Sequence, residues 1–149
     1  MKITELTKEL VVPNDLSKIS KKHYNVYANP HGGQRTSTHR MVLFYAVECA
    51  LKSCMLKRYP SSTIVSKIES LLHKDHKITK ILSTMKLPNW QNYSSPPDMI
   101  ISGDSGNKRS LNDAHACWRY GLAIESNSER QITEWLETVY RFLEKGNHI

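Results

Sequence analysis

The sequence has few of the features that stabilise small secreted proteins or anchor proteins in a membrane. It contains only three cysteines (Cys49, Cys54 and Cys117), and this odd number argues against a disulfide framework and indicates buried thiols in a reducing cytoplasm. Residues 1–12 alternate charged and apolar residues instead of holding an apolar block, so we expect no signal peptide. No apolar run is long enough to span a bilayer. We therefore expect a cytoplasmic protein without membrane contact.

Internal repeats and low-complexity tracts are also missing from the sequence. The chain of 149 residues is long enough for one domain with its own core. We therefore expect a single domain over residues 1–149, in which residues 1–12 form a short helix or a frayed arm.

Acidic residues are scarce in the first half of the chain. Residues 1–86 hold 15 Lys and Arg against 6 Asp and Glu, a balance of +9, whereas residues 87–149 hold 6 against 8, a balance of −2. A basic half favours an anionic partner, and nucleic acid is the commonest one. The alternative is a solvated lysine-rich surface that keeps the protein in solution.

One stretch, Arg40–Arg58, predicts a buried helix. Glu48 is the only charged residue between Met41 and Leu51, and no proline or glycine interrupts the run. A helix that is apolar nearly all round is a buried helix. The stretch therefore predicts the central helix of a small bundle, with a cap at Ser37 or Thr38.

Apolar residues at helical spacing predict further helices around the central one. They cover residues 16–26, 64–72, 78–85, 111–123 and 128–143. Ser128 and Gln131 have the spacing of a capping box at the start of the last helix, and Gly146 is placed to end it.

Prolines and glycines concentrate in residues 87–110 and predict a long irregular loop, which includes a short strand at residues 99–102. The expected fold is thus all-α: an up-and-down bundle of four to six helices with this loop inserted.

Three short motifs in chain order resemble HEPN domains, the nucleotide-binding helical domains of prokaryotes and higher eukaryotes. Tyr45–Lys52 is similar to the Y-A-x-E-x-x-L-K pattern of their second helix, His76–Leu82 to the helix that follows, and Trp118–Tyr120 to an aromatic-Arg-Tyr motif near the last helical unit. The resemblance covers roughly residues 36–145. It implies a HEPN-like bundle that binds RNA or a nucleotide and forms a homodimer.

The same resemblance implies a biological setting and an activity. HEPN-like domains of this kind include metal-independent ribonucleases that act in phage defence or in toxin–antitoxin pairs, with an antitoxin or another defence component as protein partner. The resemblance implies no cofactor and no metal. The alternative function is a catalytically inactive HEPN-like interaction or dimerisation module.

Arg109 and His115 are the candidate catalytic pair. HEPN ribonucleases resemble one another in an Arg followed by four to six residues and a His, and five residues separate these two. In the composite cleft that the resemblance implies, Arg109 holds the scissile phosphate and His115 moves a proton. Ser110 and Cys117 depart from the family pattern, which has Asn or Asp and an aromatic residue there. The alternative is an Arg at a helix start and a half-buried His.

Arg119 lies in the aromatic-Arg-Tyr motif, but no histidine follows it at the ribonuclease spacing. Family members of this kind resemble binding modules more than nucleases, which makes Arg119 a candidate for nucleic-acid contact. The alternative is structural. A charge within an apolar run needs a partner, and a buried Glu48–Arg119 pair would supply one and fix the register of two helices.

Arg35 and His39 lie next to the Gly32–Gly33 turn and to a predicted helix N-terminus, where backbone amides favour an anion. They are therefore candidate phosphate-binding residues. The alternative is an ordinary turn and helix cap.

Two other patterns carry no site. His73 and His76 have no further His or Cys cluster to complete a metal site, so we expect no metal. Gly103–Gly106 resembles the nucleophile motif of chymotrypsin-like proteases, but a mostly helical chain lacks the β scaffold that positions such a triad. A Gly/Asp/Ser turn explains that segment.

Overall fold

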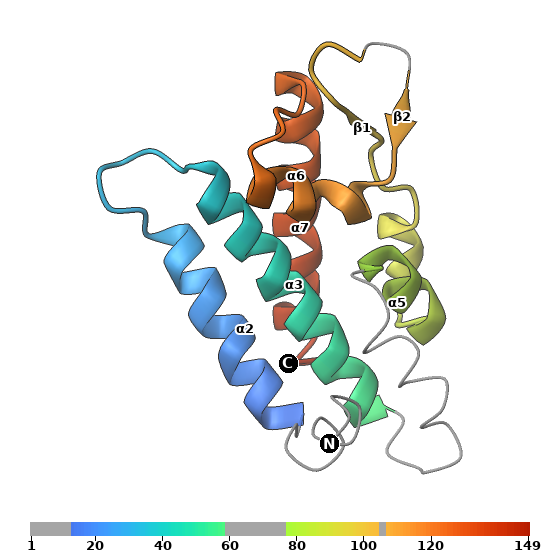
Figure 1. Cartoon of the computed structure of the whole chain (residues 1–149). Coiled ribbons are helices and arrows are strands. Elements are labelled where there is room, and N and C mark those ends of the chain that lie inside the picture. Colours follow the sequence, from blue (N-terminus) through green and yellow to red (C-terminus); the bar gives the residue numbers. More distant parts are fainter. Residues whose placement is uncertain (1–12, 59–76, 105–106) are drawn as a thin grey trace, which may run out of the picture.

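The computed structural model describes residues 13–58, 77–104 and 107–149, and these residues are mostly helical (Figure 1). The helices are α2 (Pro13–Ala28), α3 (Ser37–Arg58), α5 (Ile78–Met85), α6 (Ala114–Tyr120) and α7 (Ser126–Lys145), with short 3-10 helices η2 (Trp90–Tyr93) and η3 (Leu111–Asp113). The predicted helical character of the fold is confirmed. The expected helix at residues 64–72 and the expected arm at residues 1–12 lie outside the described residues.

Helix α3 is the centre of the fold, as its apolar sequence predicts. It packs against α2, α5, α6 and α7 (Figure 1). Leu43, Val47 and Leu51 on α3 are fully buried. Such burial of large apolar side chains is the main source of stability for this bundle. In the described parts of the chain, no helix is long and apolar enough to cross a membrane.

Helices α2 and α3 approach each other through small side chains. Ser17 Oγ lies 2.6 Å from Ser53 Oγ, and Ser20 Oγ donates a hydrogen bond of 2.7 Å to the carbonyl oxygen of Ala46. All three serines are buried, so these bonds satisfy polar groups that water cannot reach. The short side chains thereby allow two helices to pack closely along their length.

Stacked aromatic rings join α2 to α7. The rings of Tyr24 and Tyr140 are nearly parallel, with centroids 3.9 Å apart and an interplanar angle of 6°. This contact connects the first described helix to the last one, so α2, α3 and α7 form one bundle, which α5 and α6 extend on the far side of α3 (Figure 1).

The region predicted as an irregular loop contains a small antiparallel sheet. Strand β1 (Met99–Ile100) pairs with β2 (Lys108–Arg109), and Met99 lies opposite Arg109. The backbone N–H of Glu125 donates to the carbonyl oxygen of Ile100 at 2.8 Å, which connects β1 to the segment before α7. The predicted strand at residues 99–102 is thus confirmed in its first half, and its partner strand was not predicted.

The predicted cap of α7 is wrong. Glu125, not Ser128, caps the helix: its carboxylate accepts hydrogen bonds of 2.9 Å from the backbone N–H groups of Asn127 and Ser128, which lower the pKa of Glu125. The Ser128 hydroxyl is instead engaged with β1, where it accepts from the N–H of Ile100 at 3.0 Å. Gly146 is the C-cap of α7, as predicted.

Candidate functional site

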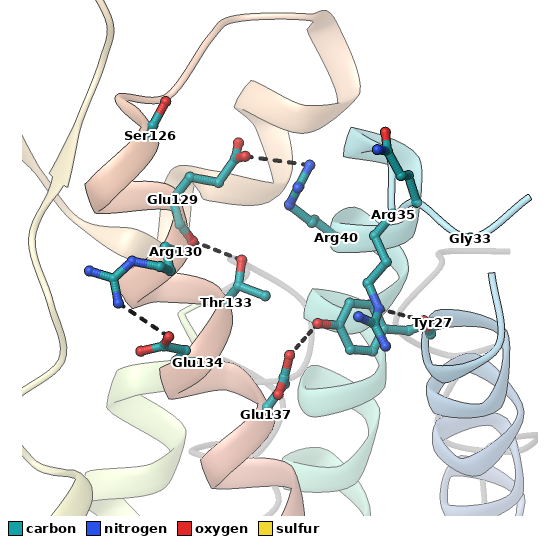
Figure 2. A pocket seen from close by; sticks show the side chains of 11 residues that line it. Tyr27, Gly33, Arg35, Arg40, Ser126, Glu129, Arg130, Thr133, Glu134 and Glu137 are labelled. Atoms are coloured by element: carbon teal, nitrogen blue, oxygen red, sulfur yellow. Dashed lines mark hydrogen bonds and ion pairs between the residues drawn. The ribbon is translucent and has the colours of Figure 1, made fainter.

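A cavity of about 620 Å³ lies between the loop after α2, the start of α3 and the first half of α7 (Figure 2). We call it the α3–α7 pocket. Its charged lining consists of Arg35, Arg40, Arg130, Glu129, Glu134 and Glu137. This volume is in the range of pockets that take small molecules. The numbers of arginines and glutamates are equal, so the ability of the pocket to bind a charged ligand depends on which of these side chains are already paired.

The loop that precedes α3 brings Arg35 to the rim of this pocket. Gly32 and Gly33 both have positive φ angles, of 87° and 85°, and side chains rarely allow this conformation. The two glycines therefore turn the chain back toward the last turn of α2 before α3 begins. The turn places Arg35 beside Tyr27 (Figure 2).

Arg35 is held by the backbone and the ring of one residue. Its Nε donates a hydrogen bond of 2.9 Å to the carbonyl oxygen of Tyr27, and its guanidinium carbon lies 4.4 Å from the centroid of the Tyr27 ring. A cation over an aromatic face is attracted by the ring. Among the described residues, no carboxylate pairs with Arg35, so its terminal nitrogens remain available at the pocket rim.

Tyr27 continues this contact to α7. Its hydroxyl donates a hydrogen bond to Oε1 of Glu137, and burial together with this bond raises the pKa of Tyr27. Tyr27 is 1% exposed, so the tyrosine is a fixed wall of the pocket and not a mobile surface group. The chain Arg35–Tyr27–Glu137 thus connects the loop, α2 and α7.

The other two arginines of the pocket have glutamate partners. Arg40 Nη1 lies 3.4 Å from Glu129 Oε1, and Arg130 Nη1 donates to Glu134 Oε1 at 3.3 Å. The second oxygen of Glu129 accepts a hydrogen bond of 3.1 Å from Trp118 Nε1. These glutamates therefore orient both arginines and neutralise much of their charge.

His39, the predicted companion of Arg35, caps α3. The backbone N–H of Thr36 donates to His39 Nδ1 at 3.1 Å, and the N–H of His39 donates to Thr36 Oγ1 at 3.5 Å. This reciprocal pair is a capping box with histidine in the position of the usual Glu. The predicted cap at Ser37 or Thr38 is therefore wrong, because Thr36 fills that role. His39 does not line the α3–α7 pocket.

Arg109 and His115, the predicted catalytic pair, have different surroundings. Arg109 is exposed on β2. His115 is partly buried, and its ring centroid lies 4.9 Å from that of Phe44 and 6.2 Å from that of Tyr45, both on α3. These ring contacts agree with the alternative that the sequence left open, a half-buried histidine. Neither residue lines the α3–α7 pocket.

The predicted Glu48–Arg119 pair is wrong. Glu48 is 4% exposed, and its Oε1 lies 2.7 Å from Lys52 Nζ, one helical turn further along α3. Arg119 is exposed, and its guanidinium carbon lies 5.8 Å from the ring centroid of Tyr120. This ion pair of Glu48 lies within one helix, at the (i, i+4) spacing, and no ion pair of Arg119 occurs within the described ranges.

The cysteines and histidines form no metal site where the structure can be read. No group of three or more His, Cys, Asp or Glu side chains gathers in residues 13–58, 77–104 or 107–149. Burial raises the pKa of the Cys49 and Cys54 thiols to about 11, so both stay protonated near neutral pH. His73, His76 and the Ser105–Gly106 part of the protease-like motif lie outside the described residues.

Sequence reasoning identified Arg35 but missed Arg40, Arg130 and the glutamates of the α3–α7 pocket. The spacing of Arg130 and Glu134, four residues apart, was a local signal for their ion pair. No such signal exists for Arg40 and Glu129, which are brought together by the packing of α3 on α7. Comparison with models of protein families, with curated proteins and with solved structures found no match to this chain.

Proposed function

We propose that this chain is a HEPN-like helical domain that binds RNA or a nucleotide by holding a phosphate at the rim of the α3–α7 pocket. The observation that carries the proposal is the set of contacts that Arg35 makes. Its Nε is used by the Tyr27 carbonyl and its flat face by the Tyr27 ring, so the guanidinium has a fixed orientation. The terminal nitrogens that remain match the bidentate geometry of phosphate oxygens.

The rest of the pocket supports an anion of limited charge. Arg40 and Arg130 lie beside Arg35 in the lining, but each already has a glutamate partner. An incoming phosphate would therefore gain mainly from Arg35, and the glutamates would repel a highly charged ligand. A single phosphate group at the pocket rim is the arrangement that these charges favour.

The charge distribution supports steering of such a ligand. Residues 1–86, which contain Arg35, carry a balance of +9. A positive field of this kind raises the rate at which nucleic acid meets the protein. The setting that the resemblance implies, a toxin–antitoxin pair or a phage-defence system with a protein partner, is compatible with an RNA-binding domain.

The proposed function is binding of RNA or a nucleotide. Cleavage of RNA by Arg109 and His115 of a single chain is not part of it. His115 packs on aromatic rings of α3 while Arg109 is exposed on β2. Metal-independent ribonuclease activity would need these motifs to meet in a cleft between two protomers. Incubation of the protein with total RNA, with and without a chelator, distinguishes the two functions.

The test of binding is fluorescence anisotropy with a labelled single-stranded RNA at several salt concentrations. Arg35→Ala should lower the affinity about tenfold or more, because it removes a charged hydrogen-bond donor. It should also reduce the dependence of log Kd on log salt by about one phosphate contact. The matched control is Lys80→Ala, which removes one exposed positive charge from α5, outside the pocket. Equal affinities of both variants, or no binding at low salt, would contradict the proposal.

A second candidate function, dimerisation or docking of a protein partner, is favoured by two exposed apolar side chains. Tyr120 is 74% exposed and Leu122 is 54% exposed, on either side of the turn that ends α6. Aromatic residues are enriched at protein interfaces. Sedimentation equilibrium at micromolar concentration should show a homodimer that Tyr120→Ser weakens, whereas a monomer at all concentrations would contradict a homodimer.

A further inference from the structure

A second cavity, of about 560 Å³, lies at the opposite end of α7, between its last turns and the segment around η2. We call it the C-terminal cavity. Its lining includes aromatic rings and cations, beside small and uncharged residues. The aromatic residues are Tyr93, Phe142 and His148, and the cations are Arg141 and Lys145. The α3–α7 pocket shares no lining residue with it.

The three aromatic side chains of the lining contact one another in the order Tyr93, Phe142, His148. The centroids of Tyr93 and Phe142 are 4.6 Å apart with an interplanar angle of 34°, and those of Phe142 and His148 are 5.8 Å apart. All three residues are partly buried, so each keeps part of its ring accessible. Half-buried aromatic rings of this kind form a surface on which a flat ligand ring can stack.

The cations lie on one face of α7, four residues apart. Arg141 and Lys145 are both exposed, and a helix places residues at this spacing beside each other. Arg141 Nη2 lies 3.3 Å from Glu137 Oε2, but Glu137 belongs to the lining of the other pocket. None of the described residues that line the C-terminal cavity is acidic.

His148 also lies near a positive charge, that of Arg58. Burial and the nearby charge of Arg58 lower the pKa of His148, which favours the neutral ring, and a neutral ring can stack without adding charge. The lining of the C-terminal cavity therefore combines aromatic rings with cations, in contrast to the balanced charges of the α3–α7 pocket.

We infer that the C-terminal cavity binds a small aromatic anion, whose flat ring stacks on Tyr93 or His148 and whose phosphate or carboxylate group contacts Lys145 and Arg141. The cavity volume is in the range of sites for ligands of this size. The inference does not depend on RNA binding at the α3–α7 pocket, because the two sets of lining residues are separate.

The test is isothermal titration calorimetry with four probes: phenyl phosphate, benzoate, AMP and uncharged phenol. Phenyl phosphate should bind more tightly than phenol, because only the former can use Lys145 and Arg141. Comparison of phenyl phosphate with benzoate identifies the preferred anionic group, and AMP tests whether a nucleobase serves as the ring. Binding of phenyl phosphate should weaken as salt is added.

Variants locate the ligand in the C-terminal cavity. Lys145→Gln should weaken binding of phenyl phosphate about threefold, as expected for one exposed charge, and Tyr93→Leu should weaken it about fivefold or more through loss of stacking. Lys80→Gln, on α5, is the charge-matched control and should bind as the unchanged protein does. Circular dichroism checks that each variant is folded, and Lys145→Gln retains the test if Tyr93→Leu fails to fold.

The inference would be overturned by no binding of any anionic probe, by equal binding of phenol and phenyl phosphate, or by unchanged binding of phenyl phosphate to Lys145→Gln and Tyr93→Leu. Arg35→Ala separates this result from the proposed function. It should keep the phenyl phosphate binding that Lys145→Gln and Tyr93→Leu weaken, even though its affinity for RNA falls. Loss of phenyl phosphate binding in Arg35→Ala would place the anion in the α3–α7 pocket and refute the C-terminal cavity as its site.

Discussion

Replacement of Leu51 by alanine tests whether α3 is the centre of the core. The Leu51 side chain is 0% exposed, and α3 contacts four other helices. The substitution removes three carbon atoms, each worth about 0.8 kcal/mol when buried, which amounts to about 2.4 kcal/mol of lost transfer free energy. The cavity left behind adds to this loss, so the free energy of unfolding should fall by about 3 kcal/mol, within the roughly 2–5 kcal/mol seen for such changes.

The measurement is urea unfolding followed by far-UV circular dichroism. The midpoint should fall while the m value stays the same, since the surface exposed on unfolding hardly changes. For a chain of this length the thermal midpoint should drop by about 6–12 °C. Leu122→Ala is the matched control, because Leu122 is 54% exposed and its loss should cost under about 0.5 kcal/mol. If Leu51→Ala cost under about 1 kcal/mol, or no more than Leu122→Ala, the central position of α3 would be refuted.

The remaining predictions concern charge, thiols and chemistry. Arg119→Ala should change the free energy of unfolding by less than about 0.5 kcal/mol, because the side chain is exposed; a loss of several kcal/mol in urea unfolding would restore a buried role. Burial raises the pKa of the Cys49 and Cys54 thiols in the folded protein to about 11. Above pH 9 the unfolded chain therefore loses these protons before the folded protein does, and the free energy of unfolding should fall between pH 9 and 11. A urea midpoint that stays constant over that range would contradict this. The same thiols should react slowly with a disulfide reagent at pH 8 until the protein is unfolded, and fast labelling of the native protein would show that they are accessible. Total RNA should remain intact on incubation with the protein, whereas cleavage that survives a chelator and is lost in His115→Ala would favour the ribonuclease.

The bundle could be predicted from the sequence where helices bury a continuous apolar face. The centre of the fold was clear because the run around Glu48 is apolar on all sides, and α5 and α7 followed from helical spacing. Strand β2 could not be predicted, because Lys108 and Arg109 are exposed and pair through their backbone, which leaves no pattern in the side chains. The predicted cap of α7 was wrong because the Ser128 hydroxyl accepts a hydrogen bond from the backbone N–H of Ile100 in β1 instead.

The candidate site was predictable only in its local part. Two glycines before a helix indicated Arg35, and the structure places that residue at the pocket rim. The ion pair of Arg40 with Glu129 joins positions far apart in the chain, and its formation depends on the packing of α3 against α7. Glu48 pairs with the nearby Lys52, whereas the apolar run around Glu48 had predicted a pair with the distant Arg119.

The two carboxylate oxygens of Glu129 have a consequence for how the molecule opens. One oxygen contacts Arg40 of α3 and the other accepts from the indole of Trp118 on α6, while Glu129 itself belongs to α7. Separation of any one of these helices breaks a contact of the same side chain, so opening of one favours opening of the others. Amide hydrogen exchange should therefore protect this end of the bundle as one cooperative unit. Deuterium would then enter α6 and the first turns of α3 and α7 at a common rate, and the α3–α7 pocket would exist only while that unit is closed.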